Sequence, residues 1–352
     1  MFVRVGVVVM LAAAAALTVV GCGVGGSLET PGAVTAIIGP DGGLLESGGL
    51  TLVVPAGAVP EPTEFVMALV TAAPRAAPPN GLALLSGGQF DVNGVNTFAT
   101  PVSITFPLSR RLRGDSRVPL WQLYNGVTWR ITDADVSSPV SALVSADGRF
   151  ASAAVRHFTV YAILADYAPF EVGRSWTYRR TIQTTGGPPG PPEPDISTVV
   201  ATITSTTGTV GELTTYVWSE KNEFDNPVQT LYYHRSDAEL LLVAIEEEGQ
   251  PIKVLTPPAK VLMLPPAPGQ TWEVTTGLFD TTAQASVTAE TITVGVKEYD
   301  TMKVHIAPPS AGEYLDMWFA PNVGPVKREQ SFVGPDVGTV VIEMDLQSYS
   351  LP

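Results

Sequence analysis

Hydrophobic and polar residues alternate along many short segments of this chain, which is the pattern of half-buried β-strands. Residues 50–54, 102–106 and 340–346 either alternate in this way or are fully apolar, and Gly, Pro, Asn or Asp bound them. Helical periodicity is hard to find beyond the Ala/Leu-rich N-terminal segment, and the 31 prolines recur too often for helices of normal length. The sequence therefore predicts an all-β protein.

The longest apolar run lies at the N terminus, between Arg4 and the only cysteine, Cys22. At about 1.5 Å per residue it is too short for the roughly 30 Å hydrocarbon core, which favours a signal peptide over a membrane span. Its end, residues 18–22 (Thr-Val-Val-Gly-Cys), resembles the lipobox of bacterial lipoproteins. An ordinary secretory leader with an incidental cysteine is the alternative.

The lipobox resemblance implies that residues 1–21 are removed and that Cys22 is acylated with chains such as palmitate, so that it becomes the membrane anchor. Residues 22–32 are rich in Gly and predict a short tether between the lipid and the first domain. Gly23 stands where many inner-membrane lipoproteins have Asp. By that family's sorting rule, an exported protein anchored in the bacterial cell envelope, on the outer membrane where there is one, is expected.

The net charge and the lack of recognisable catalytic, metal-binding and nucleotide-binding motifs limit the functions that this sequence predicts. The formal net charge is −14, which argues against nucleic acid and against docking onto anionic lipid. Of three histidines, none is spaced with another ligand as zinc requires, and no nucleophile elbow, phosphate loop or dinucleotide fingerprint is present. Loop carboxylates lack the pattern of a calcium loop. No metal, cofactor or enzymatic activity is predicted.

A composition change near residues 165–168 predicts a boundary between two domains, at 33–165 and 168–352. In the first, a Gly42-Gly43 turn precedes the apolar strand 50–54 and the segment 55–60 (Pro-Ala-Gly-Ala-Val-Pro). This order resembles the zonula-occludens/Unc-five domain, called here the ZU-five domain. The resemblance implies a β-sandwich of the kind used in adhesion, scaffolding and receptor proteins.

The closing segment of this domain, His157-Phe158-Thr159, offers a sharper alternative. Some relatives of the ZU-five domain carry His-Phe-Ser and cut their own chain before the serine through an N-to-O acyl shift. Thr159 could attack the preceding carbonyl if the backbone were strained and His157 took the proton. Ordinary alternation in a closing strand explains the same residues.

The second domain is rich in aromatic residues and is similar to uncharacterised domains of bacterial lipoproteins. Its strands also resemble, more faintly, the half-barrels that carry lipoproteins, so an antiparallel sheet or a half-barrel is expected. The Gly-x-x-Trp of Gly173 is echoed at Gly269, which hints at an internal repeat. A half-barrel could place five rings around an apolar cavity: Trp176, Tyr178, Trp218, Trp272 and Trp318. Packing in the core is the alternative.

These observations favour a lipid-anchored binding or scaffold protein whose partner is a protein or a glycan. A carrier or sensor of an apolar ligand, using the aromatic cavity, is the second hypothesis. A self-cleaving module that cuts between Phe158 and Thr159 is the third.

Overall fold

The structure is a computed structural model that describes residues 32–70, 76–93, 97–124, 126–131, 140–185, 193–275, 278–279, 281–309, 312–334 and 338–352. The predicted leader, Cys22, most of the tether and most of the Pro/Gly-rich insertion around residue 190 lie outside these ranges. In the described ranges the chain consists of β-strands and one short 3-10 helix, η1 (Pro79–Gly81), which confirms the all-β prediction. None of the described residues belongs to a helix long and apolar enough to cross a membrane.

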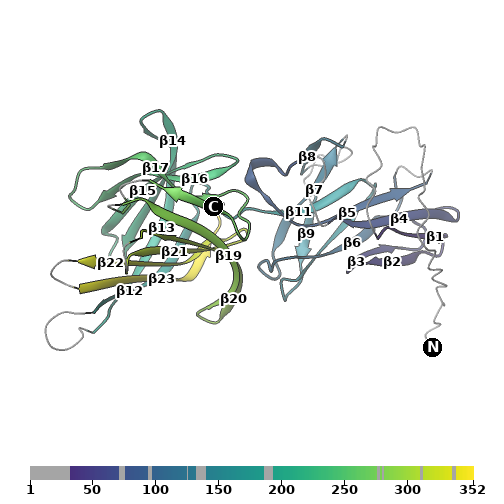
Figure 1. The fold of residues 1–352 in the computed structure, drawn as a ribbon. Coiled ribbons are helices and arrows are strands. Elements are labelled where there is room, and N and C mark those ends of the chain that lie inside the picture. The colour runs from purple at the N-terminus through teal and green to yellow at the C-terminus, as the bar shows by residue number, and fades with distance from the viewer. Residues whose placement is uncertain are drawn as a thin grey trace.

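The first domain, on the right of Figure 1, consists of eleven strands. These are β1 (Val34–Ile38), β2 (Gly43–Ser47), β3 (Leu50–Val54), β4 (Thr63–Val70), β5 (Ala83–Val92), β6 (Val102–Pro107), β7 (Arg117–Tyr124), β8 (Thr128–Arg130), β9 (Ser141–Val144), β10 (Phe150–Val155) and β11 (Val160–Ala165). They pair in the order β1-β4-β5-β11-β7-β9-β10-β6-β3-β2, with β8 beside β7. Because β7 pairs with both β11 and β9, it joins the two layers that enclose the core.

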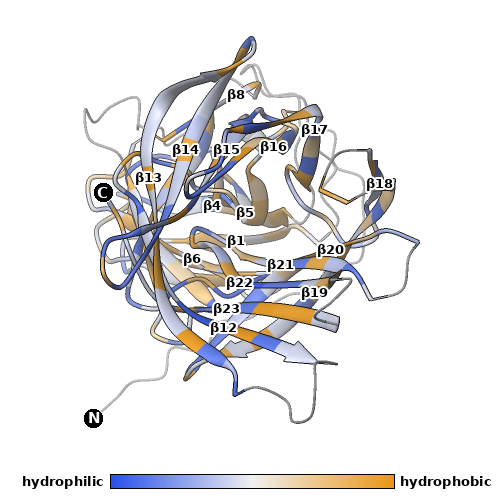
Figure 2. Ribbon diagram, turned by 90° about the vertical axis from the view of Figure 1, so that its left-hand side faces the viewer, coloured by the Kyte–Doolittle hydropathy of each residue, from blue (hydrophilic) through white to orange (hydrophobic). Residues whose placement is uncertain are grey.

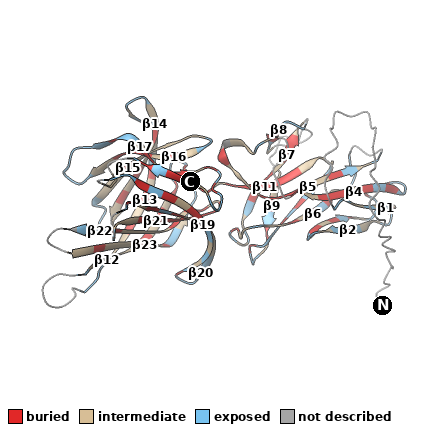
Figure 3. Cartoon of the chain, in the orientation of Figure 1, coloured by how far each residue is buried: buried red, intermediate tan, exposed pale blue. Residues whose placement is uncertain are grey.

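Alternation along the strands places the core of the first domain. In β6, the side chains of Val102, Ile104 and Phe106 are fully buried, whereas Ser103 between them is exposed. Figure 3 shows the same alternation of buried and exposed positions along neighbouring strands. Burying each of these side chains contributes about 1.5–3 kcal/mol, so the period-two pattern specifies which face of each strand turns inward.

The second domain, on the left of Figure 1, is a twelve-stranded sheet in which every pair of consecutive strands except β17 and β18 are neighbours. The strands are β12 (Ser175–Thr185), β13 (Asp195–Val210), β14 (Leu213–Asn222), β15 (Pro227–Arg235), β16 (Glu239–Glu247), β17 (Lys253–Met263), β18 (Thr271–Val274), β19 (Ala283–Val294), β20 (Lys297–Ala307), β21 (Tyr314–Ala320), β22 (Gly324–Gly334) and β23 (Gly338–Ser350). The first strand pairs with the last, β12 with β23, so the ends of the sheet fall at β17 and β18.

The Gly-x-x-Trp echo corresponds to equal backbone geometry at the start of β12 and β18. Gly173 has φ +90° and donates to Ile203, and Gly269 has φ +86° and donates to Val287, at 2.8 and 2.9 Å. In both places the partner strand donates back, over 3.0 Å, to the residue after the glycine. The domain therefore consists of two six-stranded halves, β12–β17 and β18–β23, that open in the same way.

The sheet curls until its two edges approach each other. The indole Nε1 of Trp272 in β18 donates to the carbonyl of Lys260 in β17 over 2.9 Å. In Figure 2 the strands surround a common interior, and orange hydrophobic positions alternate with blue polar ones along them. Trp176, Val304 and Ile306 are fully buried in this interior. In the part of the chain that the structure describes, no strand ladder joins β17 to β18, so packing and this hydrogen bond close the rolled sheet.

Candidate functional site

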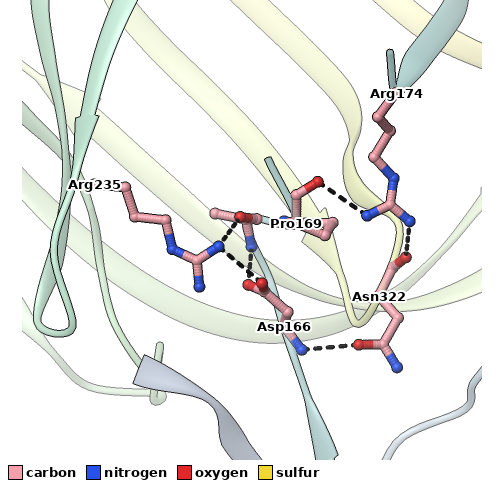
Figure 4. A network of polar contacts seen from close by, with 6 residues as sticks. Asp166, Pro169, Arg174, Arg235 and Asn322 are labelled. Carbon is pink, nitrogen blue, oxygen red and sulfur yellow. Dashed lines mark hydrogen bonds and ion pairs between the residues drawn. The ribbon is translucent and has the colours of Figure 1, made fainter. Parts of the chain in front are cut away.

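The segment between β11 and β12 is fixed to the second domain by polar contacts, which Figure 4 shows from close by. Asp166, the first residue after β11, accepts an ion pair from Arg235 at 2.8 Å. The backbone N–H of Asp166 donates to Oδ1 of Asn322 over 2.9 Å, and the N–H of Asn322 donates to the carbonyl of Asp166 over 2.6 Å. Arg235 also donates to the carbonyl of Ala168.

A second arginine holds the other end of this segment. Arg174 is buried and donates to the carbonyls of Pro169 and Asn322 over 2.9 and 3.0 Å. Burial lowers the pKa of its guanidinium below the ordinary value of an arginine. A linker held by two arginines is preorganised, and it fixes the position of the first domain relative to the second.

A cleft of about 480 Å³ opens where this segment meets the two domains. Its volume is in the range of pockets that take small ligands, and domain interfaces are a preferred place for such pockets. We call it the interdomain cleft. Its lining comprises Leu82, Pro119, Trp121, Leu164, Asp166, Glu171, Tyr216, Arg235, Ser236, Asp237 and Asn322.

The first domain supplies an apolar wall. Trp121 in β7 lies opposite Ala162 in the neighbouring strand β11. The ring belongs to a small hydrophobic cluster on this side of the sheet, in which Leu164 is buried and Leu82 is half-buried. The wall is formed because β7 and β11 are apolar on both faces, one toward the core and one toward the cleft.

The second domain and the linker supply a polar wall. Arg235 ends β15, and Ser236 and Asp237 follow it in the turn to β16. Tyr216 in β14 reaches the cleft from the same domain and packs edge-on against Phe170, with ring centroids 5.8 Å apart. Hydroxyl, amide and guanidinium groups and carboxylates thus line the same small volume.

Close contacts between the two domains hold the walls of the cleft in place. At Gly81, with φ +65°, an added Cβ would lie 2.5 Å from the carbonyl oxygen of Asp237. Elsewhere on the interface the N–H of Arg111 donates to Asp300 over 2.9 Å, and its guanidinium pairs with Glu298. Burial opposes ionisation of Asp300, but hydrogen bonds from the Arg111 N–H and the Thr291 hydroxyl, together with the positive charge of Arg111, outweigh it and lower the pKa of that carboxyl.

The interior of the rolled sheet holds a second, much smaller cavity of about 30 Å³. That volume accommodates about two water molecules, since one needs roughly 10–15 Å³ measured in this way. An ion pair crosses it, from Arg328 on β22 to Glu220 on β14, at 3.2 Å. Trp218 and Gln229 also donate to Glu220, over 3.0 and 2.6 Å.

The five aromatic residues predicted to surround an apolar cavity do not converge on one. Tyr178 and Trp218 line the small interior cavity. Trp176 is stacked on Trp218, with centroids 4.6 Å apart, and its Nε1 donates to a loop carbonyl over 2.7 Å. Trp272 joins the edges of the sheet. These side chains fill the core of the domain.

Trp318 lies on the other face of the sheet. It pairs in register with Lys303 and Lys327, whose Nζ atoms are 4.7 and 5.5 Å from its ring centroid. The neighbouring Met317 lines the interior cavity and so points the opposite way. Lysines therefore cover Trp318.

The segment His157-Phe158-Thr159 is integrated into the first domain. The Thr159 hydroxyl donates to the carbonyl of Leu123 over 3.0 Å, and Nε2 of His157 lies 3.2 Å from Oε1 of Gln122. Phe158 packs edge-on against Phe98, with centroids 4.8 Å apart. In this arrangement the hydroxyl is directed to Leu123 and not to the imidazole that self-cleavage would need as a base.

Sequence reasoning missed the residues of the interdomain cleft. Trp121, Tyr216 and Arg235 come from three strands of two domains, and no spacing connects them. One signal was present, because Asp166 stands at the predicted boundary. A charged residue that ends an apolar strand at a domain boundary is a candidate for an interface contact.

The comparisons with known proteins leave the chain without an assigned family. No family model matches it, and no curated protein does. Among solved structures, it is similar to a predicted exported protein with a YmcC-like fold from Bacteroides fragilis NCTC 9343, at 14% identity and a TM-score of 0.28, over 53% of this chain and 100% of that one. A predicted lipoprotein from Parabacteroides distasonis ATCC 8503 matches at 13% identity and a TM-score of 0.28, over 53% and 99% of the two chains. Similarity at this level carries no argument about function.

Proposed function

We propose that this chain is an exported, lipid-anchored binding protein without catalytic activity, and that the interdomain cleft is its binding site. The cleft itself supports the binding role most directly. It combines ligand-sized volume, an aromatic wall and a polar wall, and contacts between the two domains hold those walls in place.

The membrane anchor in this proposal is Cys22, after cleavage of residues 1–21. The lipobox-like residues 18–22 support it. Two or more acyl chains hold a protein firmly on a membrane, since each buried methylene contributes about 0.8 kcal/mol. In Figure 1, β1 and β2 lie at the end of the first domain remote from the second domain. A tether that leads into β1 would therefore leave the cleft facing away from the lipid, with a ZU-five-like first domain as the spacer.

Metabolic labelling with palmitate tests the anchor. The full-length protein expressed in a bacterial host should incorporate label and stay with the membranes, whereas Cys22→Ser should do neither. Equal labelling of both proteins would refute the anchor while leaving the binding role open.

A photo-crosslinking amino acid in the cleft tests the binding role. Placed at Asp237, which lines the cleft and is exposed, it should give a discrete adduct in intact cells. The same group at Glu248, exposed in the turn after β16, is the matched control and should give none. Adducts of equal yield from both positions, or none from Asp237, would contradict the proposal.

A further inference from the structure

The two walls of the interdomain cleft differ in chemistry, and this difference points to a class of ligand. We propose, resting on the binding role above, that the cleft takes a neutral carbohydrate, with a pyranose ring lying against Trp121 and its hydroxyls against the opposite wall. A pyranose has the same two-sided character, because one face presents C–H groups and its edge presents hydroxyls.

The apolar wall fits a ring of this kind. Trp121 is half-buried and packs against a hydrophobic cluster that includes the buried Leu164 and Trp129. Nε1 of Trp129 donates to the carbonyl of Ala76 over 3.0 Å, which fixes the orientation of that ring. A large aromatic side chain that is held by its neighbours offers its remaining surface at low cost in conformational entropy.

The polar wall matches hydroxyl groups better than it matches ions of one sign. The Arg235 guanidinium and the Asn322 amide bring donors, and the carboxylates of Glu171 and Asp237 bring acceptors. A sugar hydroxyl donates and accepts at once, so it can use both kinds of group. A simple cation could use only the acceptors, and an anion could use only the donors.

The charge of the residues that line the cleft favours neutral sugars over acidic ones. Three carboxylates line the cleft, Asp166, Glu171 and Asp237, against one guanidinium, Arg235, which already pairs with Asp166. The formal net charge of the whole chain is −14. Phosphate and uronate groups are therefore disfavoured in this cleft. The described residues contain no group of three metal-ligating side chains placed to hold an ion, so these carboxylates are assigned to hydrogen bonding.

Isothermal titration of the full-length protein, in a detergent without a sugar headgroup, tests the class. The probes are maltotriose and the trimer of N-acetylglucosamine as neutral sugars, trigalacturonate as an acidic sugar, and the peptide Lys-Lys-Lys as a cation. At least one neutral sugar should bind, and trigalacturonate should bind at least tenfold more weakly. Trp121→Ala should weaken binding of the neutral sugar at least tenfold, and Asp237→Asn should weaken it severalfold.

Controls and outcomes separate this inference from the binding role. Phe224→Ala, an exposed aromatic away from the cleft, and Asp195→Asn, an exposed carboxylate, should leave affinity unchanged, and circular dichroism checks that each variant is folded. Neutral-sugar binding that Trp121→Ala does not affect would overturn the inference. Failure of both neutral sugars in the millimolar range would overturn it as well. The binding role itself would survive if the Asp237 crosslink still formed.

Discussion

Replacement of Glu220 by leucine tests how the second domain is stabilised. Glu220 is 2% exposed, and three donors converge on it: the Trp218 indole, the Gln229 amide and the Arg328 guanidinium. Leucine has a similar volume but accepts no hydrogen bond, so a guanidinium would remain without its counter-charge. Removal of one partner from a buried pair costs about 3–5 kcal/mol. Because 21% of the Arg328 side chain is exposed and water can solvate it, we expect about 3 kcal/mol.

Urea denaturation of the full-length protein, followed by tryptophan fluorescence, measures this loss. For a domain of this size, about 3 kcal/mol corresponds to a fall in Tm of roughly 6–12 °C. The double variant Glu220→Leu with Arg328→Met should recover most of the stability, because no unpaired charge remains. A loss below about 1 kcal/mol for the single variant, or a double variant less stable than the single one, would refute the reasoning.

Two further predictions concern the interface between the domains. Gly81→Ala should destabilise the protein by about 1–3 kcal/mol, because alanine would be strained at φ +65° and would meet the carbonyl of Asp237. Gly126→Ala, at φ +69° with no atom near, is the control and should cost only the backbone strain; equal shifts in Tm would count against the steric argument. The second prediction is a pH dependence at Asp300. Its folded pKa lies below the ordinary 3.8, so its contact with Arg111 stabilises fully above about pH 4 and is lost as pH falls through the lowered pKa. The difference between the urea midpoints of wild type and Asp300→Asn should be largest at pH 6 and should shrink as pH falls below about 4; a constant difference would contradict this.

Local patterns were enough to predict much of the fold. The segment 50–54 forms β3, and the apolar run that ends at residue 165 forms β11. The Gly-x-x-Trp echo also corresponds to equal geometry at Gly173 and Gly269. Each of these features depends on a few neighbouring residues, such as alternation in a strand or a glycine with positive φ, and a sequence shows them directly.

The prediction that five aromatic side chains surround an apolar cavity shows the limit of such local patterns. Spacing indicated rings in strands, but whether they line a cavity depends on how tightly the sheet curls. Here the sheet curls until Trp176 stacks on Trp218, and Trp318 lies on the other face. Alternation assigns each side chain to a face, but it does not decide how tightly the sheet curls around its inner face.

The sequence by itself thus determined the all-β class and the positions of many strands, because periodicity and turn residues act over a few residues. It also carries the lipobox-like signal at residues 18–22. Only the tertiary structure brought together Trp121, Tyr216 and Arg235, which belong to β7, β14 and β15. Their meeting depends on how two separate sheets dock through the Asp166 linker. Docking is decided by shape and charge across an interface, and of these the local pattern in the chain shows only the charged residue Asp166 at the boundary.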